Sequence, residues 1–152
     1  MRPCRLRIGH RDSCRGRRVP RSFSVPTGRT AVAQGARYAG WSAGANLACP
    51  TIKTTNDMPI EATDGLDALG LVPFQINPHF TDQTIAGHGG ESRSQRLHEF
   101  TVRNPQVPVL ALPEGMLVEV DGETQTLRGH GTARRFLSGA DPTDLAPGPL
   151  ST

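Results

Sequence analysis

Short apolar runs that each end in a polar or glycine-rich loop are the feature that most restricts how this chain of 152 residues can fold. Three such junctions lie at 36–44, 71–80 and 107–115, and a hairpin is predicted over 116–127 around Asp121-Gly122. Strands that alternate with possible helices predict an α/β fold. Because reactive groups in such folds collect beyond the carboxyl ends of the strands, the junctions predict a shared site.

Local signals also predict two helices. The segment after the first junction can begin a helix at Ala45. Ser92 and Gln95 have the spacing of a capping box, which predicts a helix through about Val102 that stops before Asn104-Pro105.

The sign of the charge differs between two parts of the chain. Residues 1–37 contain ten arginines and one acid, whereas residues 38–152 contain seven basic and thirteen acidic residues. The basic part has little apolar periodicity, so it cannot bury enough surface to offset the entropy of ordering. We therefore expect a disordered arginine-rich leader over 1–34, a domain over 35–137 and a flexible tail over 138–152.

The leader admits two less favoured interpretations, a mitochondrial transit peptide and an arm that binds nucleic acid through phosphate charge. A transit peptide needs an amphipathic apolar face, and this segment offers only Val19, Phe23 and Val25 among scattered prolines. Aromatic and basic residues do not interleave as single-strand binding requires. An extension outside the main domain remains the favoured interpretation.

Several classes of protein are disfavoured by composition. No apolar run approaches the roughly 18 to 20 residues that span a bilayer. The cysteines Cys4, Cys14 and Cys49 lack C-x-x-C spacing, and H-E-x-x-H is absent. We therefore expect no metal site, no membrane association and a reducing, cytoplasmic compartment.

Ser42, His79 and Glu114 each follow a predicted strand end. Together they form the set that nucleophilic acyl transfer needs: a hydroxyl, a base that takes its proton, and a carboxylate that orients the imidazole. The flanking Gly40 and Gly44 give the serine the form of a nucleophile elbow. From the pattern alone, a plain turn or helix cap for the serine and a strand-end role for the histidine stay open.

Five motifs then carry a family resemblance. They are Gly40-Trp41-Ser42-Ala43-Gly44-Ala45-Asn46, Thr54-Thr55-Asn56-Asp57-Met58-Pro59-Ile60, Gln75-Ile76-Asn77-Pro78-His79-Phe80, Gly90-Glu91-Ser92-Arg93 and Leu112-Pro113-Glu114-Gly115. In this order they resemble the peptidase E (alpha-aspartyl dipeptidase) group of serine peptidase family S51, from about Gly35 to about Leu137. The resemblance implies a three-layer α/β/α sandwich of the type shared with class I glutamine amidotransferases, and hydrolysis of dipeptides that begin with aspartate.

The resemblance implies a role for each residue of the site. Ser42 would be the nucleophile, His79 the general base and Glu114 the acid that fixes the imidazole. The backbone N–H of Ala43 would donate to the oxyanion, as the residue after the nucleophile does at an elbow. No cofactor is implied. An esterase in which the acid lies between the serine and the histidine in the chain would instead require Asp57 as that acid. The alternative role for Asp57 is a carboxylate that stabilises a turn.

Arg93 would lie in the first turn of the predicted helix at 92–102. A cation there opposes the helix dipole, and an anionic ligand would reverse the sign of that interaction. In the resembling family the matching arginine is associated with the substrate's aspartate. The alternative is an exposed arginine paired with Glu91.

The resemblance covers roughly the second half of a peptidase E chain. We therefore expect a truncated, incomplete domain that lacks the glycine-rich loop with the second oxyanion donor, whose loss typically costs 10² to 10³ in turnover. Two other classes stay open: a catalytically dead fragment that acts as a binding partner, and a nucleic-acid binder with a basic arm. The expected partner is an aspartyl dipeptide, and the sequence does not predict the oligomeric state.

Overall fold

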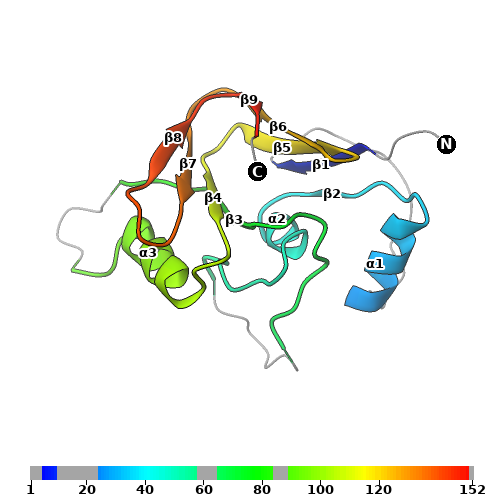
Figure 1. The fold of residues 1–152 in the computed structure, drawn as a ribbon, viewed down its shortest axis with the longest axis horizontal. Helices are drawn as coiled ribbons and strands as arrows, with labels where there is room; N and C mark the ends of the chain where they lie inside the picture. Colours follow the sequence, from blue (N-terminus) through cyan, green and yellow to red (C-terminus); the bar gives the residue numbers. More distant parts are fainter. Residues whose placement is uncertain (1–4, 10–23, 58–64, 84–88, 151–152) are drawn as a thin grey trace.

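The computed structural model describes residues 5–9, 24–57, 65–83 and 89–150, and its described strands form two sheets (Figure 1). In chain order the elements are β1 (Arg5–Gly9), α1 (Val25–Ala33), β2 (Ala39–Gly40), α2 (Ala43–Leu47), β3 (Gln75–Pro78), α3 (Arg93–Arg103), β4 (Val109–Leu112), β5 (Met116–Asp121), β6 (Thr124–Gly129), β7 (Ala133–Phe136), β8 (Thr143–Leu145) and β9 (Gly148–Pro149). One sheet has the order β2-β1-β5-β6-β9, and the other has the order β3-β4-β7-β8. The predicted α/β class is confirmed.

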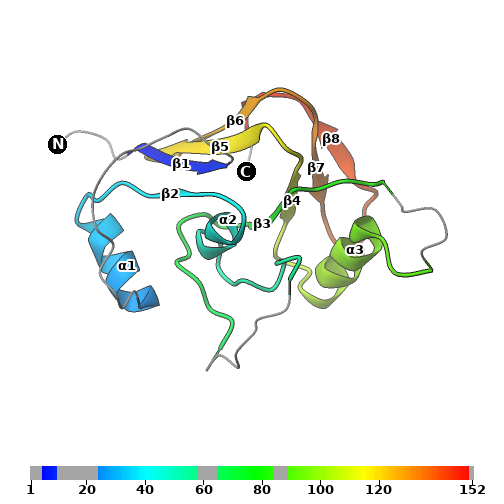
Figure 2. The same ribbon diagram turned by 180° about the vertical axis from the view of Figure 1, so that it is seen from behind.

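The strand β4 is buried on both faces. Val109 and Ala111 pack in one apolar cluster with Leu97 of α3, whereas Leu110 and Leu112 pack in a second cluster that includes residues of α2, β5 and β6. Its unbroken apolar sequence follows from this double burial, because alternate side chains of a strand point to opposite faces. The strand therefore lies in a middle layer, with α3 on one face and α2 and the β5–β6 hairpin on the other (Figures 1 and 2).

The hairpin formed by β5 and β6 agrees with the sequence-based prediction. Asp121 pairs with Thr124, so the central turn residues are Gly122 and Glu123, one position later than predicted. Gly122 has a φ of 61°, which suits the first central position of a type II′ turn.

The helix α3 begins as its sequence signal predicts. The Ser92 hydroxyl accepts from the Gln95 N–H at 3.2 Å, and the Gln95 side chain accepts from the Ser92 N–H at 2.8 Å. This reciprocal pair is a capping box, and the helix ends at Arg103, just before Asn104-Pro105.

Residues 1–34, for which the sequence predicts disorder, include β1 and α1 in the structure. Ser24 caps α1, Pro26 lies in its first turn, and Arg29 donates to the backbone carbonyls of Ala68 and Leu69. β1 pairs with both β2 and β5. These are long-range contacts, which a search for local periodicity does not find; the rest of that segment lies outside the described residues.

Residues 138–152, expected to form a flexible tail, include β8 and β9 in the structure. β8 extends the second sheet beside β7, where the Arg134 Nε donates to Asp144 Oδ1 at 2.8 Å. β9 pairs with β6, with Leu127 opposite Gly148. Short polar segments of this kind become ordered because a sheet edge offers them backbone hydrogen bonds.

Candidate active site

Ser42 lies in a tight turn between β2 and α2, where it caps the helix with φ 51° and ψ −123°. The Gly44 N–H donates to the Trp41 carbonyl at 2.8 Å, which closes the turn. A Cβ added to Gly40 would lie 2.5 Å from the Gly44 carbonyl oxygen, so only glycine fits where the turn crosses β2. The predicted nucleophile elbow therefore has the strained backbone and close approach that its glycines suggested.

Tyr38 also stabilises the turn that contains Ser42. Its hydroxyl donates to the Gly44 carbonyl at 2.6 Å. Burial, with a smaller electrostatic contribution from Cys49, raises the pKa of Tyr38 to about 12. The phenol therefore stays protonated and remains a donor across the neutral pH range.

His79 and Glu114 meet because β3 and β4 run parallel. Pro78 lies opposite Leu112, and the Phe80 N–H donates to the Leu112 carbonyl at 2.9 Å. The residues that follow the two strands therefore lie at the same sheet edge. There His79 Nδ1 and Glu114 Oε1 form a hydrogen bond.

Ser42 and His79 share an unusual backbone conformation. Among the described residues, they are the two non-glycine positions with a positive φ, 51° and 55° respectively. Such conformations cost of order 1–3 kcal/mol each and persist where the surrounding structure holds them. Strain of this kind clusters at functional sites, so the backbone marks the same two residues as the motifs.

A single small cavity joins the three expected catalytic side chains. Ser42, His79 and Glu114 line it together with residues that include Ala45 and Met116, and its volume is about 20 Å³. That space holds about one water molecule. Ala43, the expected oxyanion donor, is the first residue of α2 and follows Ser42 directly.

Arg93 and Asp57 line a neighbouring cavity of about 210 Å³. The Arg93 guanidinium donates to the carbonyls of Pro78, at 3.5 Å, and His79. It thus lies against the backbone of the expected base, partly buried, rather than in solvent paired with Glu91. Asp57 does not line the Ser42 cavity, and the carboxylate that bonds the His79 ring there is that of Glu114.

Two asparagines that sequence reasoning left without a role support this second cavity. Asn77 Nδ2 donates to Asn56 Oδ1 at 2.7 Å, and Asn56 Nδ2 donates to the Pro78 carbonyl at 2.9 Å. The pair ties the loop before residue 58 to the end of β3. Both residues belong to the motifs listed above, which was the available signal; Met58-Pro59-Ile60 of the same motif lie outside the described residues.

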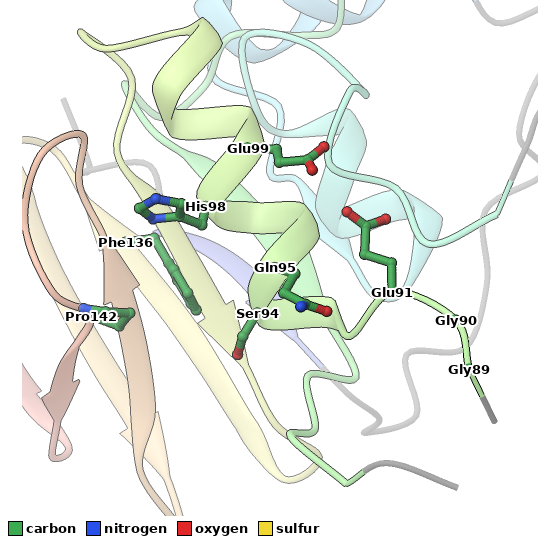
Figure 3. Close-up of a pocket in the computed structure, with 9 residues that line it drawn as sticks. All are labelled: Gly89, Gly90, Glu91, Ser94, Gln95, His98, Glu99, Phe136 and Pro142. Carbon is green, nitrogen blue, oxygen red and sulfur yellow. The ribbon is translucent and has the colours of Figure 1, made fainter. Parts of the chain in front are cut away.

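A wider hollow, of about 640 Å³, lies elsewhere. Figure 3 shows Ser94, Gln95, His98 and Glu99 of α3 around it, with Phe136 nearby. None of the expected catalytic residues lines it. Within the described ranges, no group of three metal-binding side chains gathers at any site, and no helix has the length and apolarity to cross a membrane.

Comparisons with known proteins agree with the motifs. The model of peptidase family S51 matches residues 24–128. Peptidase E of Citrobacter koseri is 53% identical over 118 residues, which cover 78% of this chain and 52% of that protein. Peptidase E of Salmonella arizonae is 52% identical over 117 residues, which cover 77% and 51%. The chain thus spans about half the length of the curated relatives it matches.

A solved structure agrees at the level of the fold. The crystal structure of a peptidase from an acI-B1 Actinobacterium superposes with a TM-score of 0.51 at 18% identity, covering 78% of this chain and 46% of that one. The family match begins at residue 24, upstream of the predicted boundary at residue 35, and so includes α1. Motif order, family model and relatives concur: the chain belongs to peptidase family S51.

Proposed function

We propose that this chain carries the catalytic residues of a serine peptidase that hydrolyses dipeptides with an N-terminal aspartate. The observation that supports this most is the shared cavity of Ser42, His79 and Glu114, in which the histidine ring is hydrogen-bonded to the carboxylate. The relatives named peptidase E support the peptidase part of this proposal.

The first chemical step is attack by Ser42 Oγ on the carbonyl carbon of the aspartyl residue. His79 accepts the hydroxyl proton, and Glu114 stabilises the imidazolium that forms. Because Nδ1 is bonded to Glu114, proton transfer from the serine falls to Nε2. Collapse of the tetrahedral intermediate breaks the peptide bond, and His79 protonates the leaving amine.

Deacylation follows by the same groups. His79 takes a proton from a water molecule, whose oxygen attacks the aspartyl ester. As the ester bond breaks, His79 gives that proton to Ser42 Oγ, and free aspartate is released. In both steps the N–H of Ala43 donates to the oxyanion, since it follows the nucleophile at the start of α2. Every proton transfer in this sequence uses a residue of the chain or water.

Selectivity for aspartate over asparagine is assigned to Arg93. The guanidinium lies beside the His79 backbone and lines the adjoining cavity, where a substrate carboxylate can form a charge-assisted pair. A neutral side chain in that place would leave the charged donor without its partner, which costs several kcal/mol.

The test compares hydrolysis of Asp-Leu and Asn-Leu by the wild-type protein and the Ser42→Ala and Arg93→Met variants. We expect Asp-Leu to be cleaved by wild type, no cleavage by Ser42→Ala, and a loss of the Asp over Asn preference in Arg93→Met. Equal rates for wild type and Ser42→Ala would refute the proposal. A fluorophosphonate probe that labels wild type but not Ser42→Ala provides a second readout.

A further inference from the structure

Ser42 and His79 lie on elements that no strand pairing joins. The strand before the serine, β2, belongs to one sheet, whereas β3, which precedes the histidine, lies at the edge of the other. Some other contact must therefore set the separation of the two side chains. The register between α2 and β3 bears directly on that separation, since Ser42 caps α2 and His79 directly follows β3.

The backbone of Ile76 in β3 carries that contact. Asn46 Nδ2 donates to its carbonyl oxygen at 2.7 Å, and its N–H donates to the Cys49 Sγ at 3.1 Å. The Cys49 thiol in turn donates to the Ala45 carbonyl at 3.4 Å. Asn46 in α2 and Cys49 just after it thus take both polar groups of Ile76 that the edge strand would otherwise offer to a neighbouring strand.

The surroundings make this contact rigid. Asn46, Cys49 and Ile76 are at most 2% exposed, and the Thr54 hydroxyl lies 2.8 Å from the same Ile76 carbonyl oxygen. Burial raises the pKa of Cys49 to about 12, so its thiol keeps the proton that it donates. A buried, fully bonded polar contact of this kind fixes one arrangement of the two elements.

We infer that Asn46 and Cys49 are positioning residues, which hold α2 against the edge of β3 and thereby set the distance between Ser42 Oγ and the His79 ring. Asn46 lies one helical turn after Ser42, and Ile76 lies three residues before His79. A shift of Ile76 relative to α2 would therefore change the separation between Ser42 and His79. The inference rests on the proposed catalytic roles of Ser42 and His79.

Its test uses Cys49→Ala, the conservative Cys49→Ser and Asn46→Asp, which replaces the donor by an acceptor. Displacements near 1 Å can cost about 100-fold in rate, so we expect kcat for Asp-Leu to fall roughly 10- to 100-fold in Cys49→Ala and Asn46→Asp, with KM within about twofold. Cys49→Ser restores most of kcat, because a hydroxyl also accepts and donates. Val118→Ala, a buried change in the same apolar cluster at a side chain that cannot hydrogen-bond to Ile76, controls for lost stability.

Crystal structures of the variants provide a readout that does not depend on activity. We expect the distance from Ser42 Oγ to His79 Nε2 to change in Cys49→Ala and Asn46→Asp and to match wild type in Cys49→Ser and Val118→Ala. An unchanged distance in the first two variants overturns the inference, as does a kcat loss in Val118→Ala as large as theirs. An inactive wild-type protein would contradict the proposed function, and the measured distances would still decide the positioning role.

Discussion

His79 Nδ1 and Glu114 Oε1 are hydrogen-bonded to each other across the ends of two parallel strands, although 35 positions separate them in the chain. The pairing of β3 with β4 brings their following residues to one sheet edge, where the imidazole and the carboxylate can meet. Because this contact engages Nδ1, Nε2 is the ring nitrogen that exchanges a proton with Ser42 in the proposed mechanism.

Replacement of Glu114 by Gln should lower kcat by about 10² to 10⁴, because an amide cannot stabilise the imidazolium and can select the wrong tautomer. The side chain is 61% exposed, so the free energy of unfolding should hardly change. Steady-state kinetics and urea melts measure the two effects. Glu123→Gln in the hairpin turn is the matched control, and equal kcat values in both variants would exclude the assigned role.

Ser42→Gly should be more stable than Ser42→Ala by about 1 kcal/mol, because glycine adopts the positive φ without steric cost. At Ser94, in the first turn of α3, the order should reverse, since glycine is a poor helix former. Urea unfolding of the four variants measures both differences. The same order at both positions would contradict the strain assigned to the elbow.

Gly40→Ala should destabilise the protein by about 1–3 kcal/mol and slow fluorophosphonate labelling, because its Cβ would lie 2.5 Å from the Gly44 carbonyl oxygen. Gly44→Ala places a Cβ 3.8 Å from the Tyr38 hydroxyl, an ordinary contact, and should be neutral or slightly stabilising within the helix. Thermal melts and labelling rates of the two variants compare the effects. A stable, rapidly labelled Gly40→Ala protein would show that the turn is less crowded than described.

Stability should fall at alkaline pH because of Cys49. Burial raises the pKa of its thiol from 9.0 to about 12, against a smaller opposing effect of the Ile76 N–H. Above pH 9 the unfolded thiol loses its proton while the folded one keeps it, so the free energy of unfolding decreases as pH rises from about 9 towards 12, by up to about 1.4 kcal/mol per unit.

Cys49→Ser lacks this titration, so urea melts of both proteins between pH 7 and pH 10.5 isolate the contribution of Cys49. The wild-type curve should steepen relative to the variant above pH 9. Parallel curves would mean that the thiol titrates alike in both states.

Local sequence signals were sufficient for several parts of the fold. The capping box of Ser92 and Gln95 specified the start of α3, and the turn after Asp121 specified the hairpin, because both depend on residues that are neighbours in the chain. The motifs also named Ser42, His79 and Glu114, which the structure places around one cavity. The catalytic roles of these three residues stay a prediction that the proposed experiments test.

Other features depended on contacts between distant residues. The sequence did not predict α1, because Arg29 binds the carbonyls of Ala68 and Leu69 some forty positions away. It did not predict that β3 would start at Gln75 instead of Leu71.

By itself, then, the sequence determined the residue types of the site and the local turns and caps, since these follow from side-chain chemistry and neighbouring dihedral angles. Only the tertiary structure decided the strand pairing of β3 with β4 and the bonds from Asn46 and Cys49 to Ile76. Those contacts join segments that are far apart in the chain, and their spacing in the sequence does not give their separation in space. The distances between the reactive atoms depend on these contacts.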